Sequence, residues 1–467
     1  MTRLVDRKRF ELEAKGAALA AEFQHWVEIT EAGRRFEKHK SQVRRITARL
    51  GGALKKIAAE IKALSDDELL TRGVQMEQKL LAVHLVWEFF RSRIALRADD
   101  YLQRYLSACD EFAWRCWEPF LRRTGAARPT TVAPDASSGV PRQPVVKEPP
   151  LVFLNGGWSP FAVSRDLSFR MDRPGFAVDR EAVAWLNTDD FGGLIEKLPV
   201  PMIGVPWFQV NHLPDALVLG HEMGHVVETD FGLSAGLEGA IAALDIKRRA
   251  AWYEWRRETF ADIFGCLAGG PAFVSTLTDF LATDPAKVSQ ENRSEPWGLY
   301  PSRWMRVALS AEALRQTGFA VEGNTAEETW RLQYGEPSQN VDFKSDIPLV
   351  VGAVLAGPYK PIEVAGSARL TDVLSYRKDA KGRPIDRALV EVIKGRGSAG
   401  LGYANEYVAA ARTLFEQDPA AYGKSTYGET ICRIIEEVAP PGTRGTPGAD
   451  LDAVLAADER DGEMDDL

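Results

Sequence analysis

The stretch Leu217–Glu228, LVLGHEMGHVVE, constrains the fold more than any other, because it contains the pattern HExxH. On a helix, residues four apart lie on one face about one turn apart, so His221 and His225 can bind a single metal ion. Glu222 stands beside them, where a carboxylate can polarise a water molecule on that ion. The stretch therefore predicts a helix that supplies two ligands and a general base to a metal site.

Two glycines in the same helix add a packing constraint. Gly220 and Gly224 each cost roughly 1 kcal/mol relative to alanine in a helix interior. Their spacing of four predicts that the backbone of another element approaches this helix closely. A plainer interpretation is a buried helix whose histidines only satisfy local hydrogen bonds. With six histidines in the chain, a chance HExxH match has a probability of roughly one in a hundred or less.

A second informative stretch, residues 248–267, contains Glu258, Ala261 and Asp262 in the pattern ExxAD. A catalytic zinc site uses three protein ligands and keeps one position open, and Glu258 is the expected third ligand. Asp262, one turn further, is expected to accept a hydrogen bond from the far nitrogen of a liganding histidine. Ala261 is small enough to let two helices pack closely at the metal. Glu254 is a rival third ligand on the same helical face.

HExxH followed by ExxAD resembles the gluzincin group of zinc metallopeptidases, of which thermolysin is the best-known member. The resemblance covers roughly residues 200–270. It implies a helix-dominated site below a small mixed sheet, one Zn²⁺ ion and a mechanism based on an activated water molecule. It also implies the roles of the matching residues, which are His221, His225 and Glu258 as ligands, Glu222 as general base and Asp262 as an outer carboxylate.

Other side chains are weaker candidates. Hydrolysis of a peptide bond needs a donor for the developing oxyanion, and Tyr300 or Arg306 are the two expected candidates, with Tyr253 as an outsider. A core or salt-bridge role is the alternative for each of them. His212, nine residues before His221, is expected to be a surface histidine rather than a contact to substrate.

Local patterns predict several boundaries. Helices before residue 123 are expected to break near Gly51-Gly52 and to restart at a capping signal at Ser65. Leu151–Asn155 is expected to be a strand. Residues 200–211 form a second extended stretch, which its prolines should limit to an edge or irregular strand. Residues 207–210 are a candidate edge for addition of a substrate peptide.

We therefore expect a mainly α protein with a small mixed β-sheet (α+β), in which a zincin-like catalytic core carries added N-terminal and C-terminal helices. The expected regions are an N-terminal long-helix region at 1–123, a proline-rich linker at 124–150, a zincin-like catalytic domain at 151–338, a C-terminal helical region at 339–439 and a disordered acidic tail at 440–467.

Charge and composition limit the partners. The chain of 467 residues has a formal net charge of −8, yet residues 1–62 hold 15 basic and 8 acidic side chains. A solvated helical face explains this excess, and a surface for nucleic acid or for an acidic partner, such as a regulatory protein, is the alternative. No nucleic-acid motif accompanies the excess, so a nucleic-acid partner is not expected. The N-terminus lacks the apolar segment of a secretion signal, and the longest apolar run, Ile347–Gly357, is too short to span a bilayer. A cytoplasmic protein without a membrane partner is expected.

Three hypotheses about function follow. The first is a zinc-dependent endopeptidase that hydrolyses a protein or peptide substrate, with Glu222 taking a proton from water activated by zinc. The second is a helical interaction protein with a structural or vestigial metal site, although such a site has no need of Glu222. The third is a peptidase held inactive by its N-terminal helices or by a partner.

Overall fold

The computed structural model describes residues 3–123, 147–163, 200–289, 297–335, 341–360, 369–395, 402–440, 442 and 444. Within these ranges the chain is mostly helical and contains one small mixed sheet, which confirms the α+β expectation. The longer helices are α1 (Leu4–Ala32), α2 (Lys40–Ala63), α3 (Asp66–Ala95), α4 (Asp100–Arg123), α7 (Leu219–Asp230), α8 (Ser234–Ala242), α10 (Arg256–Leu281), α12 (Arg303–Gln316), α13 (Ala320–Tyr334), α14 (Val341–Ala356), α16 (Ile385–Ile393), α17 (Ala404–Gln417) and α19 (Tyr427–Val438). The short ones are α9 (Arg249–Glu254), α11 (Pro285–Ser289), α15 (Leu370–Val373) and α18 (Pro419–Lys424).

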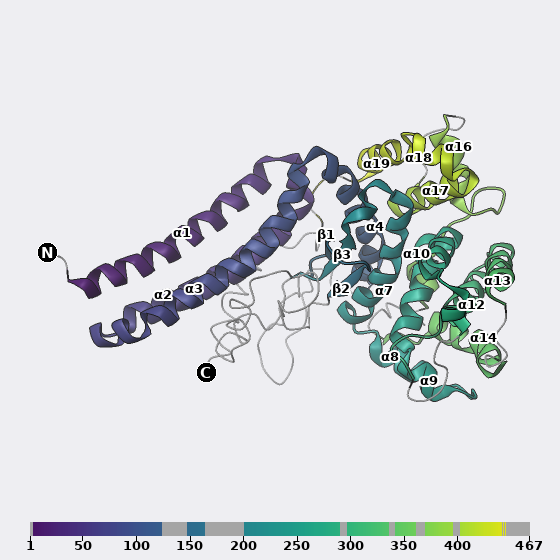
Figure 1. Cartoon of the computed structure of the whole chain (residues 1–467), viewed down its shortest axis with the longest axis horizontal. Helices are drawn as coiled ribbons and strands as arrows, with labels where there is room; N and C mark the ends of the chain where they lie inside the picture. Colours follow the sequence, from purple (N-terminus) through teal and green to yellow (C-terminus); the bar gives the residue numbers. More distant parts are fainter. Residues whose placement is uncertain are drawn as a thin grey trace.

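Helices α1, α2 and α3 form a three-helix arm that projects from a larger helical body (Figure 1). The arm has a core of its own, which includes Leu12, Ile46 and Leu80. Helix α3 begins at the expected place: Ser65 caps it and forms a capping box with Glu68. This box satisfies two backbone N–H groups at the helix start and fixes the turn between α2 and α3.

The expected helix break at Gly51-Gly52 is wrong. Both glycines lie inside α2, and the chain instead reverses between α1 and α2 at residues 33–39. Leu50 and Leu54, which flank the glycines, are buried in the arm. Burial of this apolar face outweighs the helix penalty of about 1 kcal/mol per glycine.

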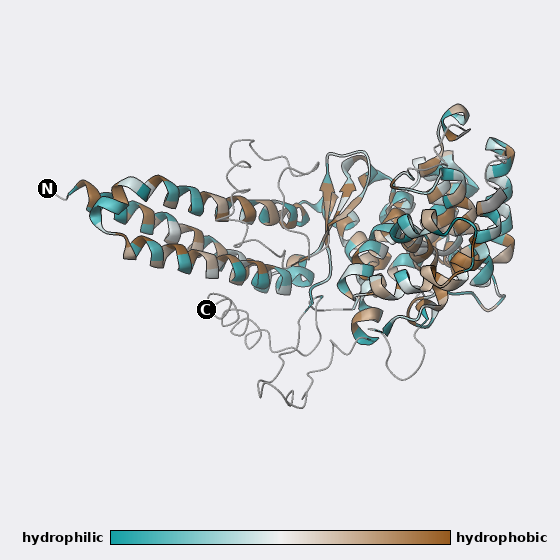
Figure 2. Ribbon diagram, turned by 90° about the horizontal axis from the view of Figure 1, so that it is seen from below, coloured by the Kyte–Doolittle hydropathy of each residue, from teal (hydrophilic) through white to brown (hydrophobic). Residues whose placement is uncertain are grey.

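The sheet lies between the arm and the body (Figure 2). Its strands are β1 (Leu151–Asn155), β2 (Phe161–Val163) and β3 (Met202–Pro206), in the order β1-β3-β2, with β1 parallel and β2 antiparallel to β3. Alternate residues face opposite sides, so that Phe153 packs into the arm core while Val152 packs into the body core. The sheet thereby joins the two cores.

The structure confirms the strand at Leu151–Asn155 but corrects the edge assignment of residues 200–211. Strand β3 is the centre of the sheet, since it pairs with both β1 and β2. Its prolines permit this position because Pro201 precedes the strand and Pro206 is its last residue, so that neither interrupts the ladder. Residues 207–210 belong to a 3₁₀ helix (Trp207–Asn211) and provide no strand edge. Within the described residues, the two edge strands of the sheet are β1 and β2.

The body is built on α10, which packs against α7, α12 and α17. Helix α4, from the predicted N-terminal region, and α17 and α19, from the predicted C-terminal region, share the same apolar core as α7 and α10. Among the described helices, α10 alone is long and apolar enough to cross a membrane, and 89% of its most apolar window is buried inside the protein. Its hydropathy is therefore that of a central core helix.

Most of the predicted linker and tail lie outside the described residues. The parts that are described are packed. Glu148 is fully buried and accepts a hydrogen bond of 2.6 Å from Ser41 Oγ. Arg444 is also buried, and its guanidinium donates to Glu111 Oε1 at 2.7 Å. Both segments therefore join the base of the arm through charged and polar contacts.

Candidate metal centre

Helices α7 and α10 meet at a crossing that only small residues permit. A Cβ atom added at Gly224 would lie 2.7 Å from Cα of Ala261, and one at Gly220 would lie 3.2 Å from Cα of Gly265. This confirms that another backbone approaches the glycines of the HExxH helix. The ExxAD segment is the element that approaches, and its alanine lies at the contact.

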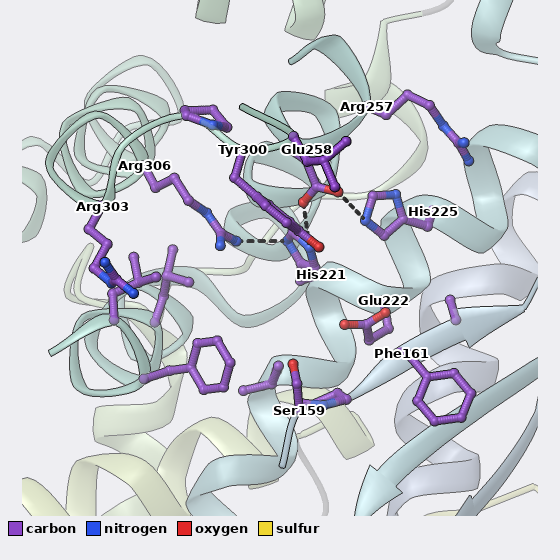
Figure 3. A pocket seen from close by; sticks show the side chains of 18 of the residues that line it. Ser159, Phe161, His221, Glu222, His225, Arg257, Glu258, Tyr300, Arg303 and Arg306 are labelled. Carbon is purple, nitrogen blue, oxygen red and sulfur yellow. Dashed lines mark hydrogen bonds and ion pairs between the residues drawn. The ribbon is translucent and has the colours of Figure 1, made fainter. Parts of the chain in front are cut away.

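The crossing brings three candidate ligands together. Nε2 of His221 lies 3.2 Å from Oε2 of Glu258, and Nε2 of His225 lies 3.5 Å from Oε1 of the same carboxylate (Figure 3). All three ligand atoms fall within 4.8 Å of one another. Both imidazoles therefore direct the same nitrogen to one point, as the spacing of four residues predicted.

These distances suit a zinc ion. Bonds of about 2.0–2.1 Å in a tetrahedral site place neighbouring ligand atoms about 3.3 Å apart. Oε2 of Glu258 is buried and, although Nε2 of His221 lies 3.2 Å away, this oxygen accepts no hydrogen bond of good geometry from the described residues. Burial of a carboxylate oxygen without a hydrogen-bond donor costs free energy unless a cation neutralises its charge. The set of two imidazoles and one carboxylate is also a ligand combination typical of catalytic zinc.

A buried relay lies behind His221. Oδ1 of Asp262 is 2.8 Å from Nδ1 of His221, so the carboxylate accepts the hydrogen bond that the sequence predicted. Arg306 then holds Asp262 with two hydrogen bonds, of 2.8 Å from Nε and 2.7 Å from Nη2. All three side chains are buried. Since Nδ1–H faces Asp262, Nε2 is the nitrogen left for a metal.

Without a metal, the same contacts govern the charges of the cluster. Burial lowers the pKa of His221, but its hydrogen bond to Asp262 and the nearby carboxylate of Glu258 outweigh burial and raise this pKa to about 9. Burial raises the pKa of Asp262, but the charge of Arg306 outweighs it and the pKa is lowered. The two histidines likewise outweigh the burial of Glu258 and lower its pKa. The carboxylates are thus held ionised, as metal ligation requires.

Glu222 and Tyr300 face the same cleft from opposite sides (Figure 3). Glu222 is only 7% exposed and is not one of the three clustered ligands. Tyr300 is 55% exposed, and burial together with the charge of Glu258 raises the pKa of its hydroxyl. Its hydroxyl is therefore protonated near neutral pH. Of the two expected oxyanion donors, Tyr300 lies at the mouth of the cleft, whereas Arg306 is engaged with Asp262.

The cleft has a volume of about 950 Å³ and is larger than the ligand cluster. One wall is formed by Ser159, which precedes β2, and by Phe161 at the start of β2 (Figure 3). Another wall is an apolar stripe at the end of α10, which sequence reasoning missed. Its members are Phe273, Leu277, Phe280 and Leu281. Their helical spacing was visible in the sequence, but the same spacing is typical of a core helix and gives no signal of a cleft.

The remaining candidates lie apart from the cluster. Glu254 lines the cleft at the end of α9 but is not grouped with the two histidines. Tyr253 does not line the cleft; its ring lies 4.5 Å from the guanidinium of Arg256. His212 packs edge-on against Phe415, with ring centroids 4.7 Å apart, and is also not part of the cleft.

Comparisons of the chain with protein-family models, curated proteins and solved structures found no significant match.

Proposed function

We propose that the protein is a zinc-dependent endopeptidase. The observation that carries the proposal is the convergence of His221, His225 and Glu258 at the floor of an open cleft, with Glu222 beside them. The resemblance of HExxH and ExxAD to gluzincins gives independent support. A purely structural zinc site normally has four protein ligands and is closed, whereas this cluster has three and faces a cleft.

Each residue has a separate task in this proposal. His221, His225 and Glu258 would hold the zinc ion, which when bound acidifies a water molecule and polarises a carbonyl group. Glu222 accepts the proton of that water and delivers it to the leaving amine. The Tyr300 hydroxyl donates a hydrogen bond to the developing oxyanion. Asp262 and Arg306 fix the tautomer and orientation of His221.

The walls of the cleft favour an extended polypeptide as substrate. Strand β2 is an edge strand that lines the cleft, and an extended chain can pair with such an edge through its backbone. Backbone pairing recognises any sequence, so selectivity must come from side-chain subsites. The apolar stripe that ends with Phe280 and Leu281 is suited to a large apolar side chain next to the scissile bond.

The test compares wild type with Glu222→Gln on an unstructured protein such as casein and on a mixed peptide library. Glutamine keeps the size of the side chain but cannot act as a base, so hydrolysis should fall at least about 10²–10⁴-fold. Zinc content and melting temperature should stay unchanged, because Glu222 is not one of the clustered ligands. Mass spectrometry of the products would also reveal the preferred side chain.

The same experiment distinguishes an endopeptidase from a metal-stabilised interaction scaffold. A scaffold would need the three ligands for its fold but not Glu222. If the purified, zinc-loaded wild type cleaves neither substrate, or if Glu222→Gln cleaves as fast as wild type, the endopeptidase proposal fails.

A further inference from the structure

Helix α2 carries the most uneven charge of the arm. It contains seven basic side chains and a single acidic one, Glu60. That carboxylate is already shared by two cations of α3, since Arg72 and Lys79 donate to it at 2.5 and 2.6 Å. With Glu60 counted, the α2 segment therefore has a formal charge of +6.

Four of these seven basic side chains are exposed. The apolar side of α2, with Ile46, Leu50 and Ile57, is buried against the other arm helices. On the opposite side Arg49, Lys55, Lys56 and Lys62 are exposed. We call these four residues the basic face. Gly51 and Gly52 lie in the same part of the helix, and a Cβ on either would meet no described atom within 4 Å.

The C-terminal segment 445–467 has the opposite composition. Its 23 residues include eight acidic side chains and one basic, Arg460, which give a formal charge of −7. Leu451, Val454 and Leu455 are its apolar residues at helical spacing. The segment thus nearly matches the charge of α2 in magnitude and opposes it in sign.

The residue just before this segment is fixed at the start of α2. The backbone N–H of Arg444 donates to the carbonyl of Lys38 at 3.2 Å, and Ser41 Oγ donates to the carbonyl of Arg444 at 2.7 Å. The Arg444 guanidinium is buried on Glu111. The acidic segment therefore leaves the described structure beside the N-terminal end of the basic helix.

Length permits the segment to follow the whole helix. The 24 residues of α2 span about 36 Å at 1.5 Å per residue. Twenty-three residues reach about 35 Å as a helix and about 75 Å when extended. Single surface ion pairs are weak, but a tether of this length holds the two charges at a millimolar effective concentration.

We infer that residues 445–467 dock on the basic face of α2 and cover it within the same chain. The occupant is assigned by charge complementarity and by the anchored position of Arg444. An external polyanion or a second copy of the chain are the competing occupants.

The first test is zero-length carbodiimide crosslinking of the full chain, which joins lysine amines directly to carboxylates. Links between Lys55, Lys56 or Lys62 and the carboxylates of 450–466 should form in the monomeric band at low salt. They should fall at least 10-fold in 1 M NaCl, because salt screens exposed charges. Absence of these links, or links only in a crosslinked dimer, would overturn the inference.

The second test measures what the segment excludes. A full-length variant with its eight acidic residues changed to amides should bind a fluorescent 20-nucleotide single-stranded DNA at least 10-fold more tightly than wild type. Adding Lys55→Glu and Lys56→Glu should abolish that gain. The exposed pair Arg249→Glu and Lys287→Glu, on the body, is the matched control and should leave the gain intact. Equal DNA binding by wild type and the amide variant would refute coverage by the segment.

Discussion

Gly224 and Ala261 are in direct contact where α7 crosses α10, and the gap between their backbones is too small for a Cβ at position 224. Three residues before Ala261 is Glu258, and three before Gly224 is His221. The contact therefore sets the distance between the two ligand-bearing turns. A small residue on each helix is as much a requirement of the centre as the ligands themselves.

Gly224→Ala should push the two helices apart. The added Cβ would meet Cα of Ala261 at 2.7 Å, and overpacking of this kind typically costs about 1–3 kcal/mol. Zinc affinity should fall with stability, because His221 and His225 move relative to Glu258. Denaturant unfolding and zinc titration measure the two effects.

Gly239→Ala is the matched control. Gly239 lies in α8, where an added Cβ would meet no described atom within 4 Å. Removing a helix glycine there should leave stability unchanged or raise it by up to about 1 kcal/mol. If Gly224→Ala and Gly239→Ala have the same stability and zinc affinity, the contact between Gly224 and Ala261 is not needed for the site.

Zinc binding should separate Glu258 from its rival Glu254. We expect about one zinc ion per wild-type chain and strong loss of zinc in His221→Ala, His225→Ala and Glu258→Ala. Glu254→Ala should keep its zinc, since Glu254 is exposed and lies outside the cluster. Elemental analysis of the purified variants provides the measurement. Full occupancy in Glu258→Ala would exclude that residue as a ligand.

The sequence predicted the parts of the centre that depend on local spacing. The HExxH and ExxAD patterns located the three clustered side chains, and the glycines indicated the close helix crossing that the structure contains. Helical periodicity fixes which residues share a face, so these relations can be predicted from the amino-acid sequence alone. The start of α3 at Ser65 was predictable for the same reason.

The parts that depend on tertiary pairing were not predictable. Strand β2 has three residues and exists only through pairing with β3. Arg444 is buried on Glu111, 333 positions away, although the composition of residues 440–467 predicted a disordered acidic tail. Likewise, Gly51-Gly52 has a helix-breaking composition, but burial of its neighbours decides the outcome. In each case a distant partner, absent from the local pattern, supplies the decisive free energy.

The relay behind His221 predicts graded losses of metal affinity. Asp262→Asn should weaken zinc binding about 10–100-fold, because asparagine lacks the negative charge with which the Asp262 carboxylate orients His221. Arg306→Lys should also weaken it, since an ammonium group cannot reproduce the two parallel hydrogen bonds to Asp262. Competition with a chelator of known affinity gives the dissociation constants.

Arg303→Gln is the control for the relay variants. Arg303 lines the same cleft, one turn before Arg306, but has no hydrogen bond to Asp262 in the described part of the chain. Its replacement should leave the zinc dissociation constant unchanged. Zinc affinity of wild-type strength in Arg306→Lys and Asp262→Asn would show that His221 is oriented without the relay.

A second buried charge network, at the base of the arm, predicts how stability depends on pH. Asp110 accepts hydrogen bonds from Arg97 at 3.0 and 2.7 Å, and its Oδ2 lies 3.0 Å from Nε2 of His39. Burial raises the pKa of Asp110, but the charges of Arg97 and His39 outweigh it and hold the pKa below its usual value of 3.8. The ionised form is therefore the one that the folded state favours.

The sign of the pH effect follows from this lowered pKa. Above about pH 4 Asp110 is ionised in both the folded and the unfolded chain, so its stabilising contribution is fully present. As the pH falls below 4, the unfolded chain takes up the proton first, and the contribution is lost.

Asp110→Asn should lower the free energy of unfolding at pH 7 by about 3–5 kcal/mol, because Arg97 remains buried without a counter-charge. The variant should also lose less stability than wild type between pH 4 and pH 2. Denaturant unfolding across that range is the measurement, with Asp6→Asn, an exposed partner of Arg3, as the control that should track wild type. An unchanged acid profile in Asp110→Asn would mean that folding does not lower the pKa of Asp110.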